Sequence, residues 1–260
     1  EEDVHGFCFI FPIIIYYSLG KYFNEHKTLN VGGVFKNLNP VSQTLKEGKF
    51  YFLGTNPGGN RLEYPDTIMN QVNLSKEKNE YIDGNWSNKE HQQTIKSVFR
   101  VLGIDLEKTF STNTSFIRSP GEQKYLPRNP IDCEQIKSST KAKKQLIKDG
   151  RETFWPIQEY FLSIVKPKIV IANGSIARDL FWNKIMNSEF SGCKIQENNV
   201  YEYSNSANKF CYFFKGDLRT ENLYIKNLNV LSLPHLSFQD YSFHKHGVEW
   251  AKKKISSLSE

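Results

Sequence analysis

Short apolar runs bounded by turn residues recur along the chain, and each has the length of a β-strand buried inside a protein. There are four such runs: Phe50 to Gly54, Phe110 to Phe116, Lys168 to Ala172 and Val230 to Leu233. We interpret them as the strands of a central sheet.

The stretches between these runs carry apolar residues at helical spacing. The pattern predicts helices over Asn88 to Leu102, Phe154 to Val165, Ser175 to Met186 and Phe243 to Leu258. Strands that alternate with helices favour a parallel sheet with right-handed crossovers and helices on both faces. We therefore expect an α/β fold, a three-layer α/β/α sandwich around a mostly parallel, four-stranded sheet.

Three further segments refine this picture. Val200 to Tyr203 and Phe210 to Phe214 have the pattern of an added hairpin. Gly59 to Ser87 and Ser119 to Gly150 are long connections, which in compact domains tend to be functional loops. The second connection carries lysines spaced as one helix face, for which a solvated surface and a phosphate-binding surface stay equally open: Lys137, Lys141, Lys143, Lys144 and Lys148.

The size and composition of the chain suit one large domain. Its 260 residues are 38% hydrophobic and 14% aromatic, enough for a sizeable core. We expect residues 1–47 to form a helical extension packed on a catalytic domain that covers residues 48–260. The apolar segment Phe7 to Leu19 is interrupted by Pro12 and is shorter than the ~20 residues that cross a bilayer, so we expect no membrane span.

Charge and cysteine content narrow the class of protein. The chain has 34 Lys and Arg against 28 Asp and Glu, and a net charge of +6 suits a polyanionic partner such as nucleic acid. The cysteines Cys8, Cys133, Cys193 and Cys211 lack both the paired spacing of a metal site and the density of a secreted disulfide scaffold. We expect an intracellular, cytoplasmic protein that binds no metal.

Polar turns follow the first and the last of the expected strands. The first strand breaks into Gly54-Thr55-Asn56-Pro57-Gly58, which carries a neutral amide at its tip. The last leads into Pro234-His235-Leu236-Ser237. Because open α/β sheets place their sites at the carboxyl ends of the strands, these two turns are expected to border the active site.

Four motifs, in this order, resemble those of the uracil-DNA glycosylase superfamily. They are Gly54 to Gly58, Thr112-Asn113 with Arg118-Ser119-Pro120, Pro167 to Gly174 with Ala177, and His235-Leu236-Ser237. The resemblance runs from about residue 48 to the C-terminal helix and is closest to the thymine/mismatch-specific and single-strand-selective branches. It implies a uracil-DNA glycosylase-like fold and cleavage of the bond between a base and deoxyribose in DNA.

The resemblance assigns roles to three polar side chains. Asn56 would position the attacking water below the anomeric carbon, which needs placement of the water more than its deprotonation. His235 would donate a hydrogen bond to the 2-oxygen of the departing pyrimidine, where negative charge gathers. Asn113 would read the pairing edge of the flipped base. Each has a structural alternative, such as a turn residue for Asn56 or a buried core histidine for His235.

Other positions bear on the choice of base. Gly58 stands where the uracil-specific branch has a tyrosine that blocks substituents at carbon 5, so a C5-modified pyrimidine should fit. Family members carry a stacking aromatic that is missing from Asp66 to Val72, and Tyr64 is the nearest substitute, with a packing role on the loop as its other interpretation. Leu236 replaces the proline of the family motif.

Contacts with DNA are expected from the glycine-rich turn, the second motif and the last loop. Gly54, Thr55 and Gly59 would approach the base and its flanking phosphates through their backbone. Phe238 and Gln239 would wedge into the gap that the flipped base leaves. The remaining expected DNA contacts are Arg118, Ser119, Arg128 and Ser237.

The resemblance implies a monofunctional DNA glycosylase that needs no cofactor and acts as a monomer on a flipped pyrimidine nucleotide in DNA. No lysine stands at position 56, so a lyase step through a Schiff base is not expected. The base would be uracil or a C5-modified pyrimidine, in DNA repair or in antiviral defence against phage DNA with modified cytosine such as glucosylated 5-hydroxymethylcytosine. Two alternatives stay open: a non-catalytic nucleic-acid-binding member of the fold, and a hydrolase of free nucleosides.

Overall fold

The computed structural model describes residues 44–55, 89–115, 139–152, 154–196, 199–203, 211–236 and 241–258. The elements in these ranges are β1 (Phe50–Gly54), α5 (Lys89–Leu102), η1 (Leu106–Lys108), β2 (Phe110–Asn113), α6 (Ser139–Glu152), α7 (Trp155–Val165), β3 (Ile169–Asn173), α8 (Ser175–Trp182), β4 (Ile185–Gln196), β5 (Asn199–Tyr203), β6 (Cys211–Arg219), β7 (Tyr224–Leu233) and α9 (Tyr241–Ser256). The expected N-terminal extension lies outside the described residues, apart from 44–47.

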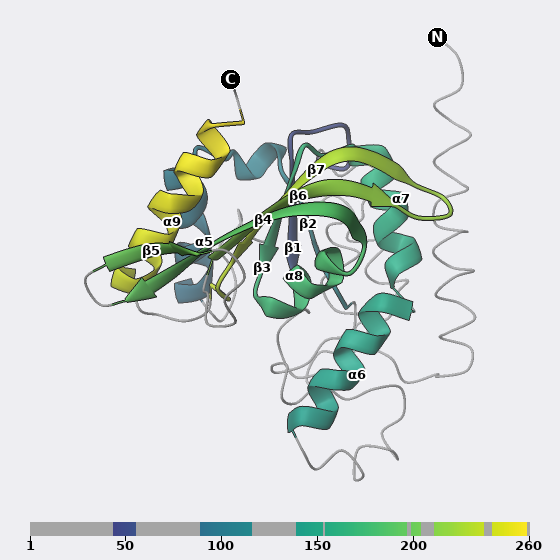
Figure 1. The fold of residues 1–260 in the computed structure, drawn as a ribbon, viewed down its shortest axis with the longest axis horizontal. Helices are drawn as coiled ribbons and strands as arrows, with labels where there is room; N and C mark the ends of the chain where they lie inside the picture. The colour runs from purple at the N-terminus through teal and green to yellow at the C-terminus, as the bar shows by residue number, and fades with distance from the viewer. Residues whose placement is uncertain are drawn as a thin grey trace.

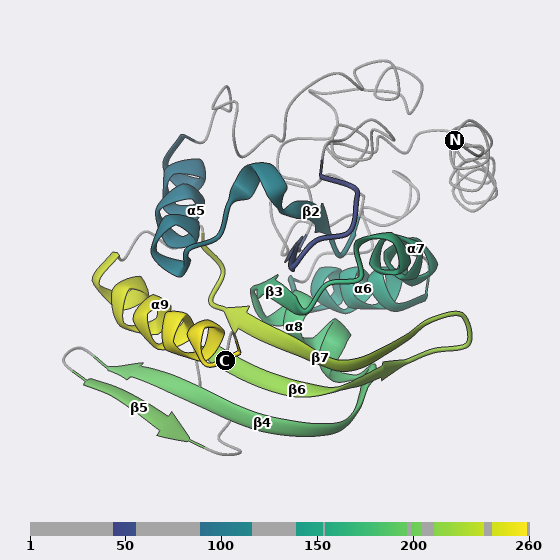
Figure 2. The same ribbon diagram turned by 90° about the horizontal axis from the view of Figure 1, so that it is seen from above.

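The strands form one mixed sheet in the order β2-β1-β3-β7-β6-β4-β5 (Figures 1 and 2). The first four run parallel, and they correspond to the four strands expected from the sequence. The other three continue the sheet in antiparallel pairing. The expected α/β fold is confirmed, and the expected four-stranded sheet is only the parallel part of a seven-stranded one.

The antiparallel part corrects two expectations. Ile185 and Met186, expected to end the helix of α8, instead begin β4 and pair with Leu218 and Asp217 of β6. β4 also separates β5 from β6, so the expected hairpin between those two strands does not form. The physical reason is that β4 is stabilised as a strand by its backbone hydrogen bonds to β6. A mixed polar and apolar sequence gives no local signal of such pairing.

Helices cover both faces of the sheet, as Figure 2 shows. Alternate residues of β1 serve different cores: Tyr51 and Leu53 pack with α6, α7 and α8, whereas Phe52 packs with α5 and α9. All three side chains are fully buried. The parallel strands are therefore apolar throughout because they are covered on both sides.

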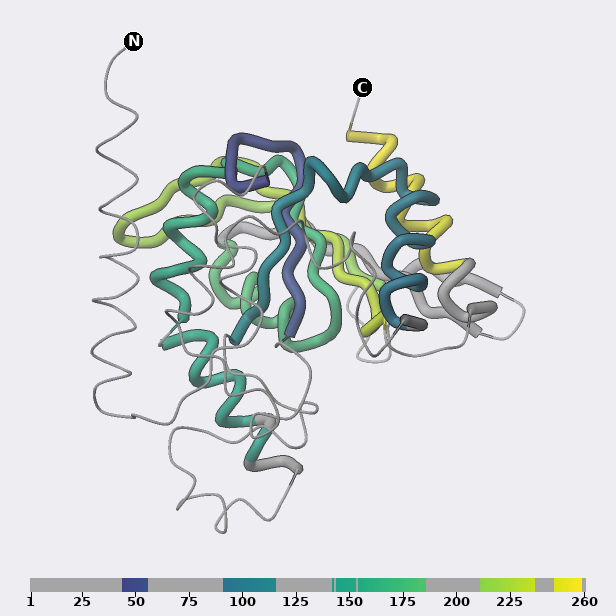
Figure 3. Tube along the Cα trace, turned by 180° about the vertical axis from the view of Figure 1, so that it is seen from behind, coloured from purple at the N-terminus to yellow at the C-terminus, as the bar shows by residue number. Residues whose placement is uncertain are grey.

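The register of the parallel strands brings their carboxyl ends to one edge of the sheet. Gly54 pairs with Asn113, and Asn173 of β3 pairs with Leu233 of β7. Figure 3 shows the beginning of α5 beside the end of β7 at this edge, and in Figure 1 α6 extends beyond it. We call this the carboxyl edge. Among the described residues, no helix is long and apolar enough to cross a membrane.

Candidate active site

Four of the site residues expected from the sequence lie in the described part of the structure: Gly54, Thr55, Asn113 and His235. All four lie at the carboxyl edge, two from β1 and its exit, one from β2 and one beyond β7. The other expected site residues lie outside the described residues: Asn56, Gly58, Gly59, Tyr64, Arg118, Ser119, Arg128, Ser237, Phe238 and Gln239.

Asn113 lies against Gly54 on the neighbouring strand. A Cβ atom added to Gly54 would lie 2.4 Å from Oδ1 of Asn113, so only glycine lets the amide lie over β1 in this way. The two residues are register partners, and their side-chain positions point to the same face of the sheet, the face of α5 and α9. The amide of Asn113 is half-buried there.

A buried hydrogen-bond chain holds Asn113 from the opposite face. The hydroxyl of Tyr51 donates to Oε1 of Gln158 at 2.5 Å, and Nε2 of Gln158 donates to the backbone carbonyl of Asn113 at 2.8 Å. Tyr51 and Gln158 are both fully buried. Because breaking a buried polar chain leaves an unsatisfied group, this chain fixes the end of β2 firmly.

The exits of β1 and β2 are joined by backbone hydrogen bonds beyond the last strand residues. The backbone N–H of Thr114 donates to the carbonyl of Gly54 at 2.8 Å, and that of Ser115 donates to the carbonyl of Thr55 at 2.9 Å. The hydroxyl of Thr114 also donates to the Gly54 carbonyl, at 3.0 Å. The segments that lead to Asn56 and to Arg118 therefore leave the sheet side by side.

His235 returns over the edge toward β1. A Cβ atom on Gly174, the residue after β3, would lie 3.3 Å from Cδ2 of His235 and 3.6 Å from Oγ1 of Thr55. Gly174 also has a positive φ of 93°, so its position needs glycine for both its backbone conformation and the close approach of His235. The residue before Asn56 and the expected base-contacting histidine thus both lie beside Gly174.

The turn that carries His235 is anchored on both sides of the histidine. The backbone N–H of Leu236 donates to Oδ1 of Asn173 at 2.8 Å, and the N–H of Gly174 donates to the carbonyl of Leu233 at 2.9 Å. Asn173 and Leu236 are buried. Leu236 stands where the motif that this turn resembles has proline, and it contributes a backbone donor that proline lacks.

His91 on α5 is a site residue that the sequence analysis missed. Its ring stacks on that of His235, with ring centroids 5.7 Å apart and planes inclined by 29°. The signal was present, since His91 precedes the buried Ile95 by four residues and so shares the apolar face of the helix. The helical spacing did not indicate that His235 would be the ring that His91 contacts.

Both histidines are held in the neutral state. Burial, and to a lesser extent the charge that His235 can carry, lower the pKa of His91 from 6.5 to about 4. Burial also lowers the pKa of His235. A neutral imidazole can still donate one N–H, so His235 can serve as a hydrogen-bond donor without bringing a positive charge to the site.

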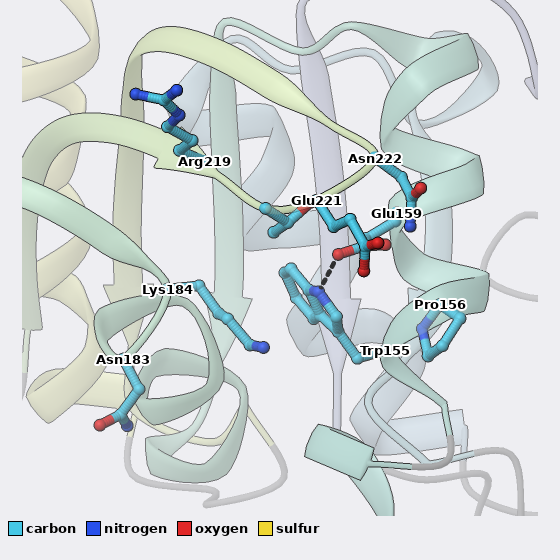
Figure 4. Close-up of a pocket in the computed structure, with 9 residues that line it drawn as sticks. Trp155, Pro156, Glu159, Asn183, Lys184, Arg219, Glu221 and Asn222 are labelled. Carbon is cyan, nitrogen blue, oxygen red and sulfur yellow. Dashed lines mark hydrogen bonds between the residues drawn. The ribbon is translucent and has the colours of Figure 1, made fainter.

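Away from the carboxyl edge, a hollow of about 510 Å³ lies on the face covered by α6 to α8 (Figure 4). We call it the Trp155 hollow. Nε1 of Trp155 donates to Oε1 of Glu159 at 2.5 Å, and the ammonium of Lys184 lies 5.0 Å from the ring centroid of Trp155. Arg219 and Glu221 complete a balanced set of charges around it. Glu159 and Lys184 are thus engaged with Trp155, and we take the cluster at the carboxyl edge as the candidate site.

Within the described residues, no group of three or more His, Cys, Asp or Glu side chains is arranged to hold a metal ion. The fold and the site together define an α/β protein with amide and imidazole groups at the carboxyl edge of its parallel strands. No protein-family model matches the sequence, and a comparison with curated proteins gives no match.

Proposed function

We propose that the chain is a monofunctional DNA glycosylase that hydrolyses the N-glycosidic bond of uracil or a C5-modified pyrimidine and leaves an abasic site. The observation that carries the proposal is the position of Asn113, His235 and Thr55, the residue before Asn56, at one edge of the sheet. The same proposal includes the finer fold class, a uracil-DNA glycosylase-like three-layer sandwich built on β2-β1-β3-β7.

His235 is suited to the leaving group. A pyrimidine that departs as an anion gathers charge on its 2-oxygen, and a preorganised donor stabilises that charge more than it stabilises the neutral substrate. Burial lowers the pKa of His235 and so favours the neutral imidazole. Its N–H can therefore donate a hydrogen bond to the oxygen, and no charged imidazolium has to be buried at the site. The anchoring of Leu236 on Asn173 restricts the turn that aims the ring.

Asn113 is suited to base recognition. Its amide offers a donor and an acceptor together, which is what the pairing edge of a pyrimidine requires. The Tyr51–Gln158 chain holds its backbone, and Gly54 leaves room for its side chain. Asn56 would position the water, and no general base is needed because the sugar cation is strongly electrophilic.

Helix α6 carries a row of exposed cations that suits a DNA backbone. Lys144, Lys148 and Arg151 are exposed and spaced at i, i+4 and i+7, so they share one face over about 10 Å of helix. Gly150 packs against Thr114, where a Cβ would lie 2.6 Å from the threonine methyl group, so the end of α6 is attached to the exit of β2. We therefore assign this row to phosphates that flank the flipped nucleotide.

The direct test is a panel of oligonucleotides that carry uracil, a thymine mismatch, 5-hydroxymethylcytosine or its glucosylated form. After incubation, alkali cleaves only strands with an abasic site. We expect product on at least one substrate and none with Asn56→Ala. DNA binding without product by folded protein would favour the non-catalytic alternative, and a preference for free nucleosides would favour the hydrolase.

The role of α6 has its own test with a matched control. Replacing Lys144 and Lys148 by glutamate should weaken DNA binding about tenfold at moderate salt and flatten its dependence on salt concentration. The same two-charge reversal at Lys252 and Lys253, exposed on α9, keeps the total charge equal and should change binding far less. Equal losses from the two pairs would show that only net charge matters.

A further inference from the structure

The rings of His91 and His235 stack on one another. His235 belongs to one of the four motifs that resemble the glycosylases, whereas His91 lies on α5, outside all four. His91 lies in the first turn of α5, and His235 lies in the turn after β7. Every strand from β2 to β7 lies between these two histidines along the chain. A contact between such distant positions is made by the tertiary fold alone.

Three contacts surround the imidazole of His235 and its turn. Gly174 approaches Cδ2, Asn173 accepts the backbone N–H of Leu236, and the ring of His91 stacks at 5.7 Å. The first two restrain the backbone and one edge of the ring. The stack restrains rotation of the ring plane, because a ring that turned about its Cβ–Cγ bond would lose the stacked geometry.

Orientation matters because the proposed reaction needs one N–H of His235 aimed at one oxygen. Hydrogen bonds weaken steeply when the donor angle falls below ~120°, so a rotating ring would donate well for only part of the time. Donors that stabilise a developing anion contribute most when they are aimed before the reaction begins.

We propose that His91 is a positioning residue for the glycosylase reaction, its ring holding the imidazole of His235 in the orientation that donates to the departing base. The inference rests on the proposed function, since it concerns the same site. A flat aromatic ring at position 91 is sufficient for this role, and its ionisation is not part of it.

The proposal separates two substitutions at one position. His91→Phe keeps a flat ring of similar size, and His91→Ala removes it. We expect His91→Ala to lower kcat about 10- to 30-fold with KM changed less than about threefold, and His91→Phe to stay within about threefold of the wild type in both. Gln93→Ala, an exposed position on the same helix, controls for disturbance of α5 and should match the wild type.

A double-mutant cycle decides whether His91 acts through His235. If it does, the His91→Ala and His235→Ala double variant should be no slower than His235→Ala alone, because the ring that His91 positions has gone. Multiplying losses, or an unchanged rate in His91→Ala, would overturn the proposal.

A spectroscopic measurement separates this inference from the proposed function. In protein with ¹⁵N- and ¹³C-labelled histidine, we expect the His235 ring signals to shift and broaden in His91→Ala and to stay as one sharp set in His91→Phe. If no oligonucleotide of the panel is cleaved, the glycosylase proposal fails, and these spectra still decide whether His91 orders His235. Unchanged His235 signals in His91→Ala would refute the positioning role whatever the activity.

Discussion

The carboxyl edge and the Trp155 hollow differ in how their polar groups are used. At the hollow, Glu159 accepts from Trp155 and Lys184 lies over the same ring, so the polar groups stabilise one another. At the carboxyl edge, hydrogen bonds hold the backbone of Asn113 and of Leu236, the residue after His235, while the side chains of Asn113 and His235 lie over glycines. A hollow in the surface therefore need not mark the functional site. We expect changes at the edge to alter activity and changes at the hollow to alter stability.

The largest expected effect is on activity at the edge. In the proposed glycosylase reaction His235→Ala would remove the donor to the leaving base, and we expect it to lower the cleavage rate about 100- to 1,000-fold, as loss of an oxyanion donor does in other enzymes. The matched change at the hollow, Lys184→Ala, should leave the rate within about twofold. Single-turnover cleavage of the preferred oligonucleotide measures both rates, and equal losses would show that the edge and the hollow do not differ in this way.

The next effect is on stability at the hollow. Trp155 is 4% exposed and packs edge-on against Phe181, with ring centroids 5.8 Å apart. Trp155→Ala should lower the free energy of unfolding by about 3 kcal/mol because it leaves a cavity in the core. Urea unfolding measures the loss, and the cleavage rate per folded molecule should not change. A large fall in that rate would place the hollow in the active site.

A smaller effect on activity tests the approach of Asn113 to Gly54. Gly54→Ala adds a methyl group where Oδ1 of Asn113 now lies, at 2.4 Å, so the amide must turn away. We expect about a 30-fold lower cleavage rate, with little change in the free energy of unfolding, because the displaced group is the end of a side chain. Gly48→Ala is the matched control, since its methyl group would meet only ordinary contacts at 3.7 Å.

The smallest effect is a pH dependence of stability. The pKa of His91 is about 4 in the fold against 6.5 ordinarily, so the unfolded chain binds more protons between these values. Stability is therefore full above about pH 6.5 and falls as the pH drops toward 4. Between pH 6.5 and 4 the free energy of unfolding should fall by about 1.5 kcal/mol more in the wild type than in His91→Phe, which has no group to protonate at position 91. Urea titrations at several pH values check this, and parallel curves would contradict it.

The parallel strands could be found from the chain because each is a short run of apolar residues covered on both faces. β1 has the bounds that its pattern predicts, and the bounds of β2 and β3 differ from the predicted ones by a few residues. β7 ends where predicted but begins earlier, at Tyr224. A strand that is buried on both faces has a continuous run of apolar residues, which is visible in the local sequence. The carboxyl-edge position of Asn113 and His235 then follows from the rule that parallel strands end at one side.

β4 and His91 show what local patterns leave out. β4 mixes polar and apolar residues and has a register shift between Met186 and Glu189, so its strand conformation comes from pairing with β6. His91 has the spacing of a core position, but nothing near it along the chain points to His235 as its partner. The spacing of apolar residues indicates which positions are buried, because it marks the face of a helix or strand that packs inward. Which two side chains meet depends on how strands and helices cross in space, and only the folded chain decides that.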